Sequence, residues 1–289
     1  MAELEHPDPD RPYHRQARGR PVARLGEIGL AAVFWFGFSI ALHVIVMTSF
    51  HARKLAGLPP DARFASGVLL LAAMTPAAVL AAIVMKRNPG ALISVYGRAR
   101  WRWLGRCLVA ATCLELVVLG LGFAIDAVRG TVELSIGVEW TVFLPRVLLV
   151  LLVIPLQAMG EEFMFRGTLL QATGRWVAAP WFAIAISSVL FALAHGLDVA
   201  GTFSIAGVGA IYAWMTIRTG GLEAALALHV ANNLTSFVAK ATVAGTDWYK
   251  LNRSWGWSSS LVHVVVCAVY AIIIVRMWRA REPATGARR

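Results

Sequence analysis

Charged side chains are scarce in this sequence. Only 15% of the residues are Asp, Glu, Lys or Arg, whereas an ordinary soluble domain has about a quarter. Apolar residues make up 58% of the chain, far more than a water-exposed surface of this size would carry. The composition therefore predicts an integral membrane protein, for which lipid is the main solvent.

Cysteine is rare as well. The three cysteines, Cys107, Cys113 and Cys267, are odd in number and form no CxxC pair. This excludes a disulfide framework and a cysteine-based zinc site, so we expect all three to pack within apolar segments. The HExxH motif of many zinc proteases is also missing from the sequence.

Long apolar runs are abundant, and most are near the ~20 residues needed to cross a bilayer. The fourth run is longer, so we expect it to tilt or to protrude. The sequence predicts an all-α, polytopic membrane helix bundle of about eight transmembrane helices. They lie at about residues 28–50, 65–85, 104–125, 141–171, 180–196, 199–217, 222–241 and 260–278.

The bundle is expected to span residues 27–280, between two polar ends. Residues 1–26 are rich in proline and arginine, a composition that predicts a disordered cytosolic arm. Residues 281–289 are predicted to form a cytosolic tail. Lysine and arginine concentrate in the arm, in the loop after the second run and in the tail, which places both termini in the cytoplasm by the positive-inside rule.

The formal net charge of +11 raises the question of the partner. Basic residues stand at the ends of apolar runs and not along one amphipathic face, a pattern that favours anionic lipid and excludes nucleic acid as a partner. We expect the protein to be integral to a bacterial plasma membrane and to contact the lipids of that bilayer. The segment 94–106 mixes Tyr96, Trp101 and Trp103 with arginines, and it is predicted to form an interfacial helix on the cytoplasmic face.

Polar motifs interrupt three apolar runs of the second half. Ionisable groups within a membrane cost roughly 2.5 to 3.5 kcal/mol each, so they are retained where they are paired or used. Counting residues from the ends of the runs puts all three motifs inside the hydrocarbon, within reach of one another. The motifs are EExxxR at Glu161, Glu162 and Arg166, FxxxH at Phe191 and His195, and HxxxN at His229 and Asn233.

The spacing within the motifs predicts their pairing. Glu162 and Arg166 are i,i+4 neighbours in the favourable order for an ion pair, which leaves Glu161 without a partner on its own helix. A buried carboxylate of this kind can activate water as a general base, with His195 sharing the water. His229 and Asn233 can donate hydrogen bonds to an oxyanion.

The same residues allow a second chemistry. Glu161, His195 and His229 provide the three ligands of a catalytic zinc site with an open fourth position. The residue pattern leaves both the general-base and the zinc-dependent mechanism open. Zinc is the only cofactor that it suggests. In both, the expected partner is a peptide or protein substrate at the membrane.

The three motifs, in this order, resemble those of the CPBP family, the CAAX prenyl proteases and bacteriocin-processing enzymes also known as the ABI family. The resemblance covers about residues 141–241 and implies an intramembrane endopeptidase acting on a membrane-associated substrate, prenylated CAAX proteins among the candidates. It implies Glu161 as the water-activating group, Glu162 and Arg166 as its support, and His195 as a second water or metal ligand. His229 and Asn233 would be oxyanion stabilisers or further ligands. The family is described both as zinc-dependent and as glutamate-dependent, so zinc stays open.

Two other functions are compatible with parts of the sequence. A member of the same family can be a non-proteolytic scaffold or a bacteriocin self-immunity protein. A proton-coupled transporter would use the glutamate and histidines as a relay, but it predicts inverted repeats and broken helices, which the sequence does not reveal. Isolated polar residues within the runs, His43, Glu115, Arg146 and His263, are expected to have structural roles.

Overall fold

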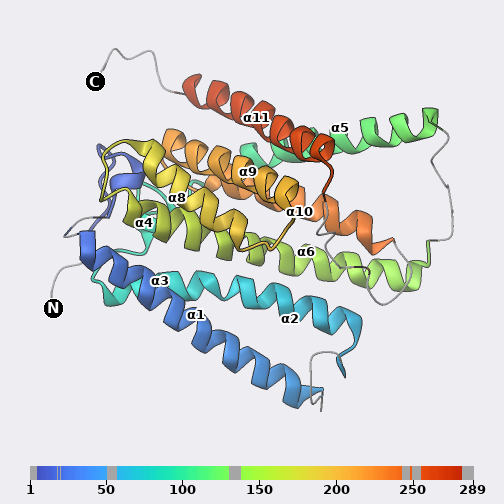
Figure 1. The fold of residues 1–289 in the computed structure, drawn as a ribbon, viewed down its shortest axis with the longest axis horizontal. Coiled ribbons are helices and arrows are strands. Elements are labelled where there is room, and N and C mark those ends of the chain that lie inside the picture. Colours follow the sequence, from blue (N-terminus) through green and yellow to red (C-terminus); the bar gives the residue numbers. More distant parts are fainter. Residues whose placement is uncertain are drawn as a thin grey trace.

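The computed structural model describes residues 5–17, 19, 21–50, 57–129, 138–242, 248 and 255–281. These residues form a helix bundle with no strand beyond two isolated bridges, which confirms the all-α prediction (Figure 1). The elements are η1 (Tyr13–Arg15), α1 (Pro21–Ser49), α2 (Pro60–Ala72), α3 (Met74–Val84), α4 (Gly90–Ile93), α5 (Trp101–Val128), α6 (Trp140–Glu162), η3 (Phe163–Leu169), α7 (Leu170–Thr173), α8 (Pro180–Leu193), α9 (Val199–Thr219), α10 (Glu223–Ala241) and α11 (Trp257–Arg279).

Six segments within the described residues are long and apolar enough to cross a membrane. These are Ala23–Ser49, Pro60–Val84, Trp101–Ile125, Trp140–Thr173, Val199–Thr219 and Trp257–Arg279. Helix α8 has only 14 residues, and α10 carries Glu223, His229 and Lys240 along its 19 residues. A polytopic membrane bundle is therefore confirmed, while the predicted number of eight spans is not.

The second span is divided at Ala73 into α2 and α3. Pro76 lies in the first turn of α3, where it has no N–H to give to a carbonyl one turn earlier, and this interrupts the helix.

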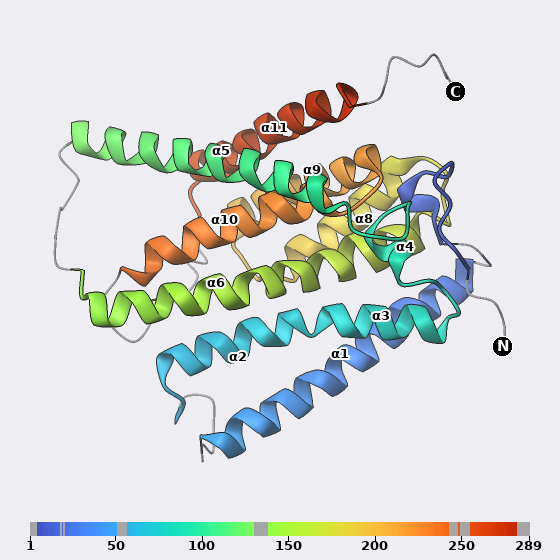
Figure 2. The same ribbon diagram turned by 180° about the vertical axis from the view of Figure 1, so that it is seen from behind.

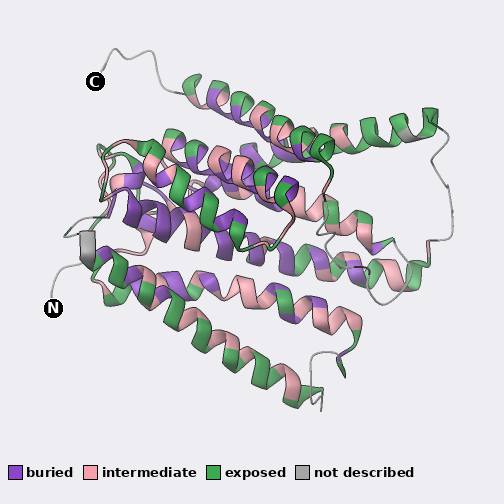
Figure 3. Cartoon of the chain, in the orientation of Figure 1, coloured by how far each residue is buried: buried purple, intermediate pink, exposed green. Residues whose placement is uncertain are grey.

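Helix α6 lies within the bundle, where it contacts α2 and α10 (Figures 1 and 2). Helix α10 also packs against α5 and α9, and α9 packs against α8 and α11. Figure 3 shows that buried residues gather where α6, η3, α9 and α10 meet, while the outer helices α1 and α5 are largely exposed. Their exposed apolar side chains, such as Phe36 and Val109, face the region where lipid would surround the bundle.

The start of α1 and the end of α11 lie at the same end of the bundle (Figures 1 and 2). This arrangement agrees with two termini on one side of the membrane, and the identity of that side stays a prediction.

Part of the N-terminal arm is ordered, contrary to the expected disorder of residues 1–26. The Tyr13 side chain is fully buried and its O–H donates to the carbonyl of Leu92. A ring nitrogen of His14 lies 3.2 Å from the carbonyl oxygen of Ala178. Helix α1 begins at Pro21, several residues before the predicted span. The arm is held because the folded bundle provides hydrogen-bond partners that the composition of the arm does not reveal. Residues 282–289 of the predicted tail lie outside the described residues.

The predicted interfacial helix over residues 94–106 is wrong. Residues 94–100 form a connection with a turn at Val95 and Tyr96, in which the N–H of Val95 donates to the carbonyl of Gly220 at 2.9 Å. Helix α5 then begins at Trp101 and continues directly into the third span. Backbone pairing with the α9–α10 turn, including the bridge between Ser94 and Gly221, takes the hydrogen bonds that a surface helix would have used.

Candidate active site

The first site motif lies where α6 changes its hydrogen bonding. Helix α6 ends at Glu162, and residues Phe163–Leu169 form a π-helical segment, η3, before α7. Segments of π-helix are rare and frequently occur at functional sites. Just before the change, Gly160 lies against the break in the second span: a Cβ atom here would overlap the carbonyl oxygen of Leu71. Glycine is required because the two backbones touch.

The predicted ion pair between Glu162 and Arg166 is present. Nη1 of Arg166 donates to Oε1 of Glu162 at 3.0 Å, and both side chains are completely buried. The same carboxylate oxygen lies 2.8 Å from Nδ1 of His229, which comes from α10. Glu162 is therefore the junction between the first motif and the third.

Glu161 has a partner from another helix. Its Oε2 lies 3.5 Å from Nε2 of His229, just beyond the length of a normal hydrogen bond. Glu161 is only 5% exposed, and this oxygen has no hydrogen-bond partner among the described residues. His229 thus lies between two buried carboxylates, with one ring nitrogen toward each.

Arg166 is enclosed by groups that its sequence motif does not name. Its guanidinium lies over the ring of Phe191 at 4.2 Å and over that of Tyr212 at 5.3 Å. Nη2 donates to the backbone carbonyl of Gly209 at 3.3 Å. A Cβ atom at Gly209 would come within 3.3 Å of both Arg166 and Phe191, so this glycine leaves room for the guanidinium. No sequence motif marks Tyr212 as a neighbour of this arginine.

His195 lies in the turn after α8 and not within the predicted helix, because α8 ends at Leu193. Its Nδ1 is 2.7 Å from the carbonyl oxygen of Phe191, and its ring packs edge-on against the Phe191 ring at 4.7 Å. Phe191 therefore fixes His195, as the FxxxH spacing predicts. The Phe191 ring also contacts His229, at 6.1 Å between centroids, so both imidazoles share one aromatic neighbour.

Asn233 bonds to a residue that the sequence analysis missed. Its Nδ2 donates to Oε1 of Gln157 at 2.9 Å, and Gln157 lies one turn before Glu161 on α6. A glutamine within an apolar run, four residues from Glu161, was a usable signal. The neighbouring Asn232 donates to Glu115 at 3.3 Å, which is the structural pairing expected of Glu115.

The expected zinc ligands are not gathered as a set. Within the part of the chain that the structure describes, no three His, Cys, Asp or Glu side chains are grouped so that they could hold a metal ion. Nδ1 of His229 is engaged with Glu162, and Nδ1 of His195 with a backbone carbonyl. Glu161, His195 and His229 therefore do not fit a three-ligand zinc site in this arrangement, and zinc dependence stays a prediction.

Comparison with known proteins points to the same part of the chain. Residues 142–235 match the family model described as type II CAAX prenyl endopeptidase Rce1-like. The uncharacterized protein YyaK of Bacillus subtilis is 28% identical over 179 residues, which are 59% of this chain and 58% of that protein. The chain thus matches less than two thirds of the length of this relative. No solved structure matches the chain.

Proposed function

We propose that this protein, whose residues 142–235 match the Rce1-like model of type II CAAX prenyl endopeptidases, is an intramembrane endopeptidase that uses Glu161 to activate water. The matched segment runs from α6 to α10 and contains all three motifs. The observation that carries the proposal is the position of His229 between the buried carboxylates of Glu161 and Glu162.

Charge balance gives this arrangement its chemistry. A buried group of ionisable side chains is favoured when its charges cancel. Glu162 and Arg166 cancel each other, and in the proposed mechanism Glu161 and His229 form a second pair that is neutral overall. Two arrangements satisfy this condition: a carboxylate beside an imidazolium, or a carboxylic acid beside a neutral imidazole. They differ by one proton between Glu161 and His229, whose facing atoms are 3.5 Å apart.

The reaction follows from the first of these arrangements. The Glu161 carboxylate accepts a proton from water while the water oxygen bonds to the carbon of the scissile peptide carbonyl. The imidazolium of His229 and the amide of Asn233 donate hydrogen bonds to the negatively charged oxygen that forms. As the C–N bond breaks, Glu161 returns its proton to the leaving nitrogen. The products are a carboxylic acid and an amine, and the site recovers its initial charge.

Other residues hold the reacting groups in position. Arg166 fixes the Glu162 carboxylate, which in turn orients the His229 ring through Nδ1. Gln157 orients the amide of Asn233 from the turn before Glu161. His195, fixed by Phe191, is the second group proposed to bind the attacking water.

The substrate class is proposed from the family and from the position of the site. A peptide bond must reach helices that are apolar enough to span a membrane, which favours a membrane-associated or prenylated polypeptide. The experiment measures cleavage of a prenylated CAAX peptide by the purified full chain in lipid nanodiscs, with mass spectrometry of the products. An unprenylated peptide of the same sequence tests the contribution of the lipid group.

The matched variants are Glu161→Gln and Glu115→Gln, which both remove the charge of a buried glutamate on a spanning segment. We expect cleavage by the wild type and by Glu115→Gln, and a loss of about 10²- to 10⁴-fold for Glu161→Gln. Equal cleavage by all three would end the assignment of Glu161. A chelator arm tests zinc, because activity that survives metal removal contradicts a zinc mechanism.

A further inference from the structure

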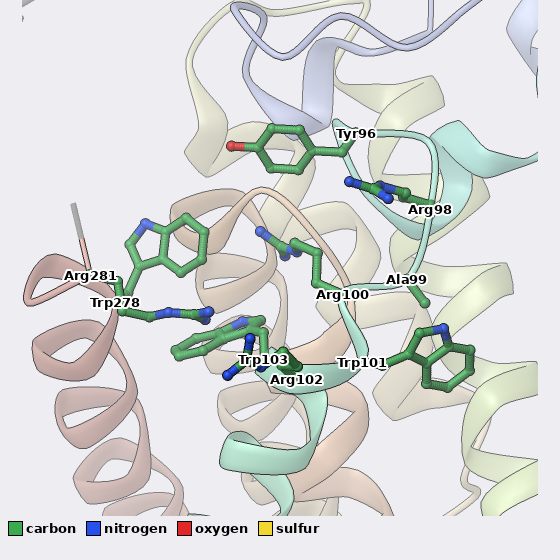
Figure 4. Close-up of a pocket in the computed structure, with 9 residues that line it drawn as sticks. All are labelled: Tyr96, Arg98, Ala99, Arg100, Trp101, Arg102, Trp103, Trp278 and Arg281. Atoms are coloured by element: carbon green, nitrogen blue, oxygen red, sulfur yellow. The ribbon is translucent and has the colours of Figure 1, made fainter. Parts of the chain in front are cut away.

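A second site lies at one end of the bundle, and neither Glu161 nor Glu162 lines it. A pocket of about 650 Å³ opens between the start of α5, the end of α11 and the connection that precedes α5 (Figure 4). Its lining consists almost entirely of arginine and aromatic side chains. The arginines are Arg98, Arg100, Arg102 and Arg281, and no acidic residue lines the pocket.

Among the described residues, one of these four arginines has an acidic partner. Arg100 donates to both carboxylate oxygens of Glu223, at 2.9 and 2.5 Å, and to the carbonyl of Thr219 at 2.6 Å. Within the described residues, no ion pair involves Arg98, Arg102 or Arg281. Burial, together with the nearby charges of Arg106 and Arg100, lowers the pKa of Arg281. The pocket therefore carries an excess of positive charge.

Aromatic residues hold two of the four arginines, Arg100 and Arg281, in place. The guanidinium of Arg100 lies 5.7 Å from the Tyr96 ring and 5.0 Å from the Trp278 ring. That of Arg281 lies 4.8 Å from the ring of Trp103. Trp103 is 1% exposed, yet its indole N–H has no hydrogen-bond partner among the described residues. The pocket therefore combines oriented guanidinium groups with a buried donor that is left unused.

The location of the pocket favours one source of anion. Helices α5 and α11 are both candidate membrane spans, so their ends lie at the level of the lipid headgroups. Trp101, which is 75% exposed at the rim, is typical of a residue at a membrane interface. Basic pockets between the ends of spanning helices bind anionic headgroups.

We propose that this pocket binds the phosphate group of an anionic membrane lipid. The planar guanidinium forks of Arg98, Arg102 and Arg281 match the geometry of phosphate oxygens, and each can donate two hydrogen bonds. The bound lipid would link the end of α11 to the start of α5 by neutralising charges that otherwise repel. This role is independent of the proposed protease activity.

The test uses the purified full chain and the lipid phosphatidylglycerol as the probe. Native mass spectrometry counts the phosphatidylglycerol molecules that stay bound after transfer into detergent. The double variant Arg98→Gln/Arg102→Gln removes two exposed pocket charges. The matched control, Arg276→Gln/Arg279→Gln, removes two exposed charges of α11 that do not line the pocket. We expect retention to fall at least several-fold in the pocket variant and to remain in the control.

Two results would overturn the proposal: equal loss of lipid in both variants, which indicates general charge attraction, or no retained lipid in the wild type. A parallel arm measures the melting temperature with inorganic phosphate, which carries the same group without a lipid tail. No stabilisation by inorganic phosphate, alongside retained lipid, supports the headgroup. With retained lipid, stabilisation by inorganic phosphate that the pocket variant abolishes supports recognition of the phosphate group in the pocket. The same stabilisation without retained lipid overturns the lipid assignment in favour of a soluble phosphate.

Discussion

Nδ1 of His229 lies 2.8 Å from Oε1 of Glu162, and this contact joins α6 and α10 through two residues that are 67 positions apart in the chain. The same carboxylate oxygen receives the Arg166 guanidinium. One anion therefore orients a histidine and neutralises an arginine, which leaves the other nitrogen of His229 directed toward Glu161. In the proposed mechanism, Glu162 positions the neighbouring groups and Glu161 reacts.

Replacing Arg166 by glutamine should lower stability strongly. Removing one partner of a buried ion pair leaves the other charge uncompensated and costs about 3 to 5 kcal/mol. The melting temperature of the purified variant measures the loss, with Arg276→Gln on the exposed side of α11 as control. A variant as stable as the wild type would show that Glu162 does not carry a buried charge.

Alanine at Gly209 should displace the Arg166 guanidinium. The added Cβ would lie 3.3 Å from Nη2 of Arg166 and from Cδ1 of Phe191, closer than most atoms pack. We expect a loss of stability of about 1 to 3 kcal/mol, as for overpacked cores, together with reduced peptide cleavage. Gly120→Ala on α5 is the matched control, since its Cβ would meet no atom within 4 Å. Similar behaviour of the two variants would contradict the packing argument.

Two adjacent asparagines should respond differently to substitution. Asn233 bonds Gln157 beside the reacting groups, whereas Asn232 bonds Glu115 on α5. Each hydrogen bond contributes on average about 0.6 kcal/mol in membrane proteins, so both leucine variants should fold. We expect kcat to fall in Asn233→Leu and to stay near the wild-type value in Asn232→Leu. If kcat falls equally in both, Asn233 has no special place in the reaction.

Docking of the N-terminal arm should weaken in acid. Burial lowers the pKa of His14 below its ordinary value of 6.5, and the positive charge of Arg15 lowers it further. The hydrogen bond to the carbonyl of Ala178 acts in the opposite direction and raises it, but by less than burial lowers it. The neutral ring is favoured in the folded state, so its contribution to stability is complete above pH 6.5 and is lost as the pH falls through the lowered pKa.

Hydrogen exchange of residues 11–17 measures this effect between about pH 8 and about pH 5, a range in which histidine titrates. Protection should decrease in acid for the wild type, after correction for the intrinsic exchange rate. It should depend less on pH in His14→Gln, whose side chain does not titrate. Constant protection of the wild type would rule out this role of His14.

Local sequence spacing predicted contacts between residues four positions apart. The Glu162–Arg166 pair and the contact between Phe191 and His195 both follow from i,i+4 positions, and the structure has both. Composition was sufficient for the membrane class, because the shortage of charge does not depend on topology. The same reasoning failed for segment 94–106, whose hydrogen bonds are made with the distant turn at Gly220.

Contacts between helices could not be read from spacing. The partner of Glu162 depends on how α6 and α10 are rotated relative to each other, and no residue pattern announces that rotation. The order of the arm had the same cause, because Tyr13 is held by a carbonyl 79 residues away. His195 falls outside α8 because Gly196 takes a positive φ of 60° that ends the helix.

The measurement that tests the account most directly is a double-mutant cycle on kcat with Glu161→Gln, His229→Gln and the double variant. Residues that act as one unit in catalysis are strongly non-additive. The account predicts that each single variant loses about as much activity as the double variant, because one proton is shared between the two side chains. Losses that multiply in the double variant would mean that Glu161 and His229 act separately, and would contradict the proposed pair.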